Sequence, residues 1–253
     1  MTTWTRRIFA GCYVLIGVGS LLPDTASAES ERARDLYVDF SVGGGVGGRL
    51  IQRPIQEGVQ RIGPGYFPAA DLAVRVWAWP EQTLSLGFAL RYQTALADRA
   101  FEHAPQAQDS ELRVRCHHVE LAVAPTFRPA ADSIWAVGVG YAMRVFWPDV
   151  HNLPTPRQFI TGPYVRPELL LSGLGPFSLR VGPELFWVLT IDPALRAAIG
   201  SKQGVAIGGQ ASIGADLGDQ YALELMYRES HVLISPELTD MERFFTAVVT
   251  RKF

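Results

Sequence analysis

Cysteine, lysine and net charge are all scarce in this chain, and each shortage excludes a class of protein. Two cysteines among 253 residues cannot build a disulfide-stapled domain or a four-cysteine zinc site. A formal net charge of -2, with 19% charged residues, gives no overall attraction to nucleic acid and excludes a disordered chain. Lysine occurs only at Lys202 and Lys252, so nearly all cationic groups are arginine. The length allows one large domain or two small ones.

The first segment has the features of a secretory signal peptide. A basic pair at 6–7 precedes a mainly apolar run over 8–22, and residues 26–28 have the A-x-A pattern of a cleavage site. We therefore expect residues 1–28 to be removed. Residues 29–253 then form the mature domain, which keeps a single thiol and has no internal disulfide.

Period-two alternation of apolar and polar residues dominates the rest of the chain. The clearest case runs from Trp135 to Trp147, where every second residue is apolar or aromatic and the residues between are small or charged. No stretch after Leu22 reaches the roughly 18 apolar residues that a transmembrane helix requires. We expect about ten strands, over residues 36–42, 72–78, 84–93, 119–127, 135–147, 165–171, 177–189, 205–217, 221–227 and 245–253.

The second face of these strands separates a membrane barrel from a soluble one. A soluble sandwich or lipocalin-like barrel shows the solvent a surface rich in Lys and Glu. Here that face is Gly, Ala, Ser and isolated charges, which suits an enclosed lumen, while the apolar face suits lipid. With a tilt of about 45°, Trp135 and Trp147 lie roughly 28 Å apart along the membrane normal. The expected interface aromatics are Tyr92, Phe127, Trp135, Trp147, Phe177, Trp187, Tyr221 and Phe253.

The connections between the expected strands alternate in length. Short connections are expected at 80–82, 128–133, 172–176 and 218–220, and long ones at 43–67, 95–111, 148–160, 192–203 and 229–243. This alternation is typical of short periplasmic turns and long extracellular loops. We therefore expect an all-β, closed, antiparallel, up-and-down transmembrane β-barrel. About ten strands are expected, with eight also possible, and both termini are expected in the periplasm.

With these features the whole mature sequence resembles bacterial outer-membrane β-barrel proteins. It ends in Phe253, which is similar to the terminal aromatic residue that the assembly machinery of this class reads. Arg251 departs from that signal, because an outward apolar residue is usual at its position. The resemblance implies a place in the outer membrane, contact with lipid and lipopolysaccharide, and recognition of the C-terminal strand by the assembly machinery. No nucleic-acid partner is expected.

Opposite charges recur at positions that are expected to face one another in the lumen. The pairings assume that Ala78 lies opposite Leu84 and that a turn is centred on Leu174. They set Asp71 opposite Arg91, Glu168 opposite Arg180, Arg166 diagonal to Glu184, and Glu120 diagonal to Arg144. We interpret them as a salt-bridged plug, since a small barrel is usually filled by its own side chains. A gate or selectivity ring is the alternative.

Three motifs suggest enzymatic or metal-binding chemistry without the context that it needs. Residues 43–48 fit G-x-G-x-x-G, but no helix pattern follows, so we expect a flexible first loop. Residues 149–151 resemble the Asp-x-His pair of omptin proteases, yet the chain has no Asp-x-Asp partner. Cys116, His118 and Glu120 share one strand face but are spread along it. We expect no catalytic residue, cofactor or metal site.

The sequence thus predicts an outer-membrane barrel with a structural or surface-interaction role through its extracellular loops. Its ligand is not indicated by any motif. A minor diffusion pore and an outer-membrane hydrolase acting on lipid A or peptide are the two alternatives. Conductance across a planar bilayer distinguishes the pore, and lipid A analysis with a peptide-cleavage screen distinguishes the hydrolase.

Overall fold

A computed structural model describes most of the chain after residue 35. The described ranges are 36–55, 58–62, 67–79, 82–104, 107–130, 132–149, 158–193, 196–197, 200, 203–218, 220–234 and 238–253. The predicted signal peptide, residues 1–28, lies outside them. Within these ranges, no helix is long and apolar enough to cross a membrane.

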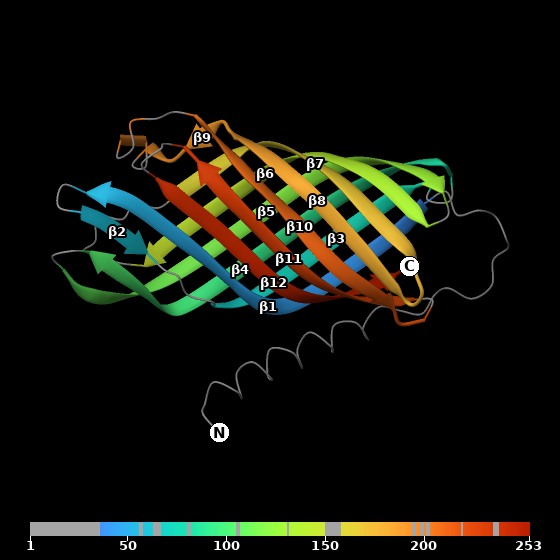
Figure 1. Ribbon diagram of the computed structural model, residues 1–253, viewed down its shortest axis with the longest axis horizontal. Helices are drawn as coiled ribbons and strands as arrows, with labels where there is room; N and C mark the ends of the chain where they lie inside the picture. The colour runs from blue at the N-terminus through green and yellow to red at the C-terminus, as the bar shows by residue number, and fades with distance from the viewer. Residues whose placement is uncertain are drawn as a thin grey trace, which may run out of the picture.

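Ten antiparallel strands form a closed barrel, which confirms the predicted fold class (Figure 1). The ten are β1 (Leu36–Ile55), β3 (Phe67–Ala78), β4 (Leu84–Ala104), β5 (Ala107–Ala130), β6 (Ser133–Asp149), β7 (Gln158–Leu174), β8 (Phe177–Val188), β10 (Gly204–Asp216), β11 (Tyr221–Leu233) and β12 (Thr239–Lys252). Each pairs with the next along the chain, and β12 pairs with β1 to close the sheet. Two short strands extend the barrel, β2 (Gly58–Ile62) beside β1 and β4, and β9 (Thr190–Ile191) beside β7.

The strands are strongly tilted because their register shifts around the barrel. Partner residues can be followed once around it through Lys252, Asp39, Arg75, Ala89, Ala122, Gly140, Tyr164, Phe186, Ala206, Val232 and Asp240. The path returns to β12 twelve residues from its start, from 252 to 240. Such a shift over ten strands corresponds to a tilt of about 40°, and Figure 1 shows the strands crossing the long axis obliquely.

The two ends of the barrel differ. We call one the short-turn end; it carries the connections after Ala78, Ala130, Leu174 and Asp216, and the C-terminus. The other, the long-strand end, carries β2, β9 and the hairpin of β4 and β5 (Figure 1). About ten residues suffice for a tilted strand to span a membrane, and β4 and β5 have 21 and 24. These two strands therefore continue beyond the bilayer.

Several segments that were predicted as parts of loops are strands. Residues 43–48 lie within β1; all six pair with β12 and residues 43–47 also pair with β3, so the expected flexible first loop was wrong. Glycine is used there for close packing, since a Cβ at Gly47 would lie 2.7 Å from the ring of buried Phe244. Likewise, β4 and β5 remain paired as far as Ala104 and Ala107, inside the predicted loop at 95–111.

The alternation places apolar side chains outside and polar ones inside. Val139, Leu121 and Leu225 are among the many apolar side chains on the outer wall, at 53, 61 and 47% exposed. Seven expected interface aromatics are 39–52% exposed on this wall, namely Phe127, Trp135, Trp147, Phe177, Trp187, Tyr221 and Phe253. The eighth, Tyr92, is half-buried, with its hydroxyl 2.8 Å from Nδ1 of His117. Such an exterior suits lipid rather than water.

Candidate functional site

Five charged side chains meet across the middle of the lumen. Arg228 donates to Glu120 and to Glu184, with Nη2 2.8 Å from Oε2 of Glu184. Arg166 binds the same two carboxylates, at 3.2 Å from Glu120 and 3.0 Å from Glu184. Arg144 lies 2.8 Å from Glu184. These residues come from β5, β6, β7, β8 and β11 and are at most 8% exposed, so this central ion-pair network fills the lumen from wall to wall.

A second group of polar side chains lies nearer the long-strand end. Arg49 donates from Nε to Asp240 at 2.6 Å and from Nη2 to Gln158 at 2.8 Å. His118 links this group to the central network, since its Nε2 is 3.0 Å from Glu120 and its Nδ1 is 3.4 Å from Glu242. All five residues are at most 4% exposed. A buried charge is stable only when it is paired and hydrogen-bonded, and Arg49 and Asp240 meet this condition through their ion pair.

On the short-turn side of the network the charges are less tightly packed. Arg91 and Asp71 form a two-pronged pair, with distances of 3.1 and 2.5 Å, and Gln93 donates to the same carboxylate at 2.8 Å. Arg180 approaches Glu224 only to 3.8 Å. The charged side chains are therefore packed more tightly in the middle of the lumen than toward the short turns.

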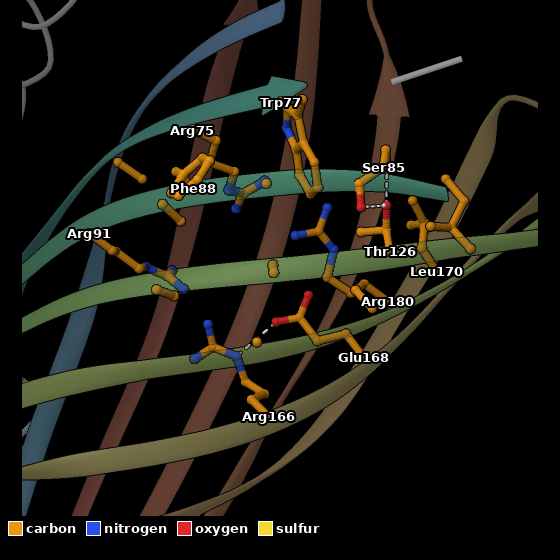
Figure 2. Close-up of a pocket in the computed structure, with 18 of the residues that line it drawn as sticks. Arg75, Trp77, Ser85, Phe88, Arg91, Thr126, Arg166, Glu168, Leu170 and Arg180 are labelled. Carbon is orange, nitrogen blue, oxygen red and sulfur yellow. Dashed lines mark hydrogen bonds and ion pairs between the residues drawn. The ribbon is translucent and has the colours of Figure 1, made fainter. Parts of the chain in front are cut away.

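A cavity of about 240 Å³ occupies this less tightly packed part. Arg75, Arg91, Arg166 and Arg180 extend into it from four different strands, with Trp77, Leu170 and Glu168 beside them (Figure 2). Its lining runs from Glu120 and Arg166 of the central network to exposed Gln82 and Arg128 at the short turns. The cavity therefore extends from the central network to exposed residues at the short-turn end.

The structure brings Asp71 and Arg91 together, although in a different register from the predicted one. Ala78 pairs with Leu86 rather than with Leu84. The prediction assumed five residues between the paired positions, whereas the connection has seven and begins at Trp79, a non-glycine residue with a positive φ of 54°. The long arginine side chain still reaches the carboxylate diagonally.

The expected opposition of Glu168 and Arg180 was wrong. The turn is formed by Gly175 and Pro176, so that Leu174 pairs with Phe177. Glycine takes this place because φ is 71° there, a left-handed conformation that leucine rarely adopts. Glu168 instead accepts a hydrogen bond at 2.7 Å from the arginine two positions earlier on its own strand.

The other two predicted pairs have different outcomes. Arg166 and Glu184 form an ion pair at 3.0 Å. Glu120 and Arg144 lie diagonally in the observed register, but each binds other residues, Glu120 on β11 and β7 and Arg144 on β8. Their side chains are long enough to cross the lumen, so the choice of partner is not limited to neighbouring strands.

Several residues of the lumen were not identified from the sequence. Arg228 follows directly after the predicted strand 221–227, and Arg49, Asp240 and Glu242 fell in predicted loops. The alternation of inward and outward side chains continues beyond the predicted ends of their strands. Extending that alternation would have placed all four residues on the inner face.

A polar cluster on the outer wall was also missed. Glu229 accepts hydrogen bonds from Tyr227 and from Arg243, whose Nε is 3.0 Å away, and His231 Nε2 lies 2.5 Å from the same carboxylate. Arg243 and His231 are 40 and 42% exposed. These outward side chains lie toward the long-strand ends of β11 and β12, where the apolar wall gives way to polar groups.

The described residues of the two candidate chemical motifs lie on β5 and at the end of β6. Cys116, His118 and Glu120 face inward and His117 faces outward, as the alternation predicts. Within the described ranges, no group of three or more His, Cys, Asp or Glu side chains could hold a metal ion. Asp149 is the last residue of β6, and His151 lies outside the described residues.

No family model matches the chain, and no curated protein matches its sequence. Among solved structures, it is similar to the outer membrane protease OmpT from Escherichia coli, with a TM-score of 0.53 and 11% identity, over 90% of this chain and 99% of OmpT. An outer membrane channel from Pseudomonas putida F1 has a TM-score of 0.41 and 9% identity, over 92% of this chain and 100% of that one. At such low identity OmpT is evidence for the fold alone.

The closed ten-strand barrel, its apolar outer wall with exposed aromatics and its charged interior define the class of the protein. It is an outer-membrane β-barrel protein.

Proposed function

We propose that the protein is a sealed outer-membrane barrel that acts at the cell surface through its long-strand end. The central ion-pair network carries this proposal. Its side chains cross the lumen between five strands and are at most 8% exposed, so an ion or solute has no open path past them. Moving the network aside would separate buried charges from their partners, at a cost of several kcal/mol for each unpaired ion.

Planar-bilayer recording tests the seal. We expect the purified barrel to give no discrete conductance steps under conditions in which a general porin, inserted in the same bilayers, conducts. Regular steps of one size from the folded barrel would contradict the sealed lumen and favour the diffusion pore. Protein that retains heat-modifiable mobility on a gel serves as the folded sample.

The orientation belongs to the same proposal, with the short-turn end in the periplasm and the long-strand end outside the cell. The unequal lengths of the two ends support it, because barrels of this class have short periplasmic turns. The outer-wall cluster of Tyr227, Glu229, His231 and Arg243 then lies on the outward side, where its exposed cationic side chain suits the phosphates of lipopolysaccharide. The C-terminal strand, ending in Phe253, is proposed to be read by the assembly machinery.

Replacement of the β4–β5 hairpin tip tests the orientation and the surface role together. Residues 98–113 are replaced by a short epitope that joins Ala97 to Val114, which are partners in the parent barrel. We expect antibody to bind intact cells and attachment of the cells to surfaces or to one another to fall, with barrel folding unchanged. Epitope that is accessible only after lysis contradicts the orientation, and unchanged attachment contradicts a role for this hairpin.

We also propose that the barrel is not a protease, because the sequence has no Asp-x-Asp partner for the Asp-x-His pair at residues 149–151, and peptide hydrolysis also requires a held water and a stabilised oxyanion. The expected result is that barrel in lipopolysaccharide cleaves peptides no faster than the Asp149→Ala, His151→Ala variant. A reproducible excess in the unmodified protein would establish the pair as catalytic.

A further inference from the structure

The cavity at the short-turn end has a composition that the sealed lumen does not require. Its lining carries five guanidinium groups, from Arg75, Arg91, Arg128, Arg166 and Arg180, and two carboxylates, from Glu120 and Glu168. Two of the arginines are already neutralised, Arg91 by Asp71 and Arg166 by the central network and Glu168. The remaining three arginines of the lining are Arg75, Arg128 and Arg180.

Arg75 and Arg180 keep donors that face the cavity. No ion pair among the described residues includes Arg75, and Arg180 has Glu224 at 3.8 Å. The acids that act on Arg75 over a longer distance are Glu168 and Glu224, and each accepts hydrogen bonds from other side chains, Glu168 from Arg166 and Gln210 and Glu224 from Ser212. Guanidinium donors are therefore in excess over free carboxylate oxygens at this level of the lumen.

Apolar side chains form the wall between these arginines and the mouth. Trp77, Ile134 and Leu170 line it, and the Trp77 ring stands above Arg180 and close to Arg75 in Figure 2. Asp39, near the mouth, accepts a hydrogen bond from Trp77 Nε1 at 3.3 Å. A ligand that enters from the short-turn end would thus meet an apolar wall first and the two guanidinium groups second.

We propose that this cavity, the arginine vestibule, binds a small amphiphilic anion. A carboxylate or phosphate group of the ligand accepts hydrogen bonds from Arg75 and Arg180, whose planar donor groups match both anions. Its apolar part packs against Trp77, Ile134 and Leu170. The volume of about 240 Å³ suits a ligand of the size of an aromatic acid. This inference goes beyond the proposed surface role and does not depend on it.

Ligand binding by the barrel in lipid nanodiscs tests the vestibule. The probes are para-fluorobenzoate, para-fluorophenyl phosphate and the neutral para-fluorobenzamide, each followed by fluorine NMR. We expect both anions to bind in a saturable manner and the amide to show only the signal of empty nanodiscs. The relative affinities of the two anions distinguish a carboxylate ligand from a phosphate ligand. Amide binding equal to that of the acid would overturn the proposal.

Variants locate the binding. Arg75→Gln and Arg180→Gln should each weaken para-fluorobenzoate binding about tenfold, the loss expected for one charge-assisted hydrogen bond. The matched control is Arg196→Gln, which removes the same charge from an exposed position beyond β9, at the opposite end of the barrel. Folding of each variant is checked by heat-modifiable mobility. Wild-type affinity in both folded vestibule variants would exclude this site, as would an equal loss in the control.

Discussion

Val139→Arg is expected to prevent stable insertion of the barrel, with a loss of about 2 to 4 kcal/mol in folding free energy. Val139 is 53% exposed on the outer wall of β6, four residues from Trp135 and eight from Trp147 on the same face. The new guanidinium group would therefore lie within the apolar band. The cross-strand partners of Val139 on the same face, Val123 and Val165, are apolar and offer no counter-charge. Urea titration of the barrel in lipid vesicles, followed by tryptophan fluorescence, measures the loss.

Two control variants show whether the loss depends on placing a charge in the middle of the apolar band. Leu174→Arg adds the same charge to the outer surface beside the turn at Gly175, where Leu174 is 53% exposed, and should cost at most about 1 kcal/mol. Gly138→Ser adds a hydroxyl group to the lumen, where a Cβ has its nearest neighbour at 3.5 Å. Gly140 is unsuitable, since a Cβ there would lie 2.2 Å from a backbone oxygen. Equal losses for all variants would refute the assignment of faces.

Arg91→Met is expected to destabilise the barrel by about 3 to 5 kcal/mol, because it leaves the Asp71 carboxylate buried without its counter-charge. Asp71 is 1% exposed and keeps only the amide donor of Gln93 at 2.8 Å. Adding Asp71→Asn to Arg91→Met should recover a large part of this loss, since a neutral amide needs no cation. The double-mutant cycle is measured by urea titration in vesicles.

The cycle also tests the diagonal contact itself. Losses from the two single variants that simply add in the double variant would mean that the side chains do not interact. Arg196→Met, an exposed arginine outside the lumen, should change stability by no more than about 0.5 kcal/mol and controls for loss of charge.

The fold could be predicted because its signal is local. Alternation from Trp135 to Trp147 assigns each side chain of β6 to lipid or lumen without knowledge of any other strand, and the same holds along the barrel. Short connections between antiparallel strands then require neighbours in sequence to be neighbours in space. Ten strands, closure and the inward position of Arg91, Glu120, Arg166 and Glu184 follow from this pattern.

Tertiary structure decided where strands end and which charges meet. Residues 43–48 read as a glycine loop, yet they continue β1 because β12 and β3 supply partners on both sides and Phe244 fills the space over Gly47. The turn geometry at Trp79 and Gly175 shifted two predicted registers, since backbone φ is not encoded in polarity. Arg228 binds Glu120 and Glu184 across the lumen. Contacts between strands that are distant in sequence depend on the diameter and shear of the closed barrel, which no local pattern contains.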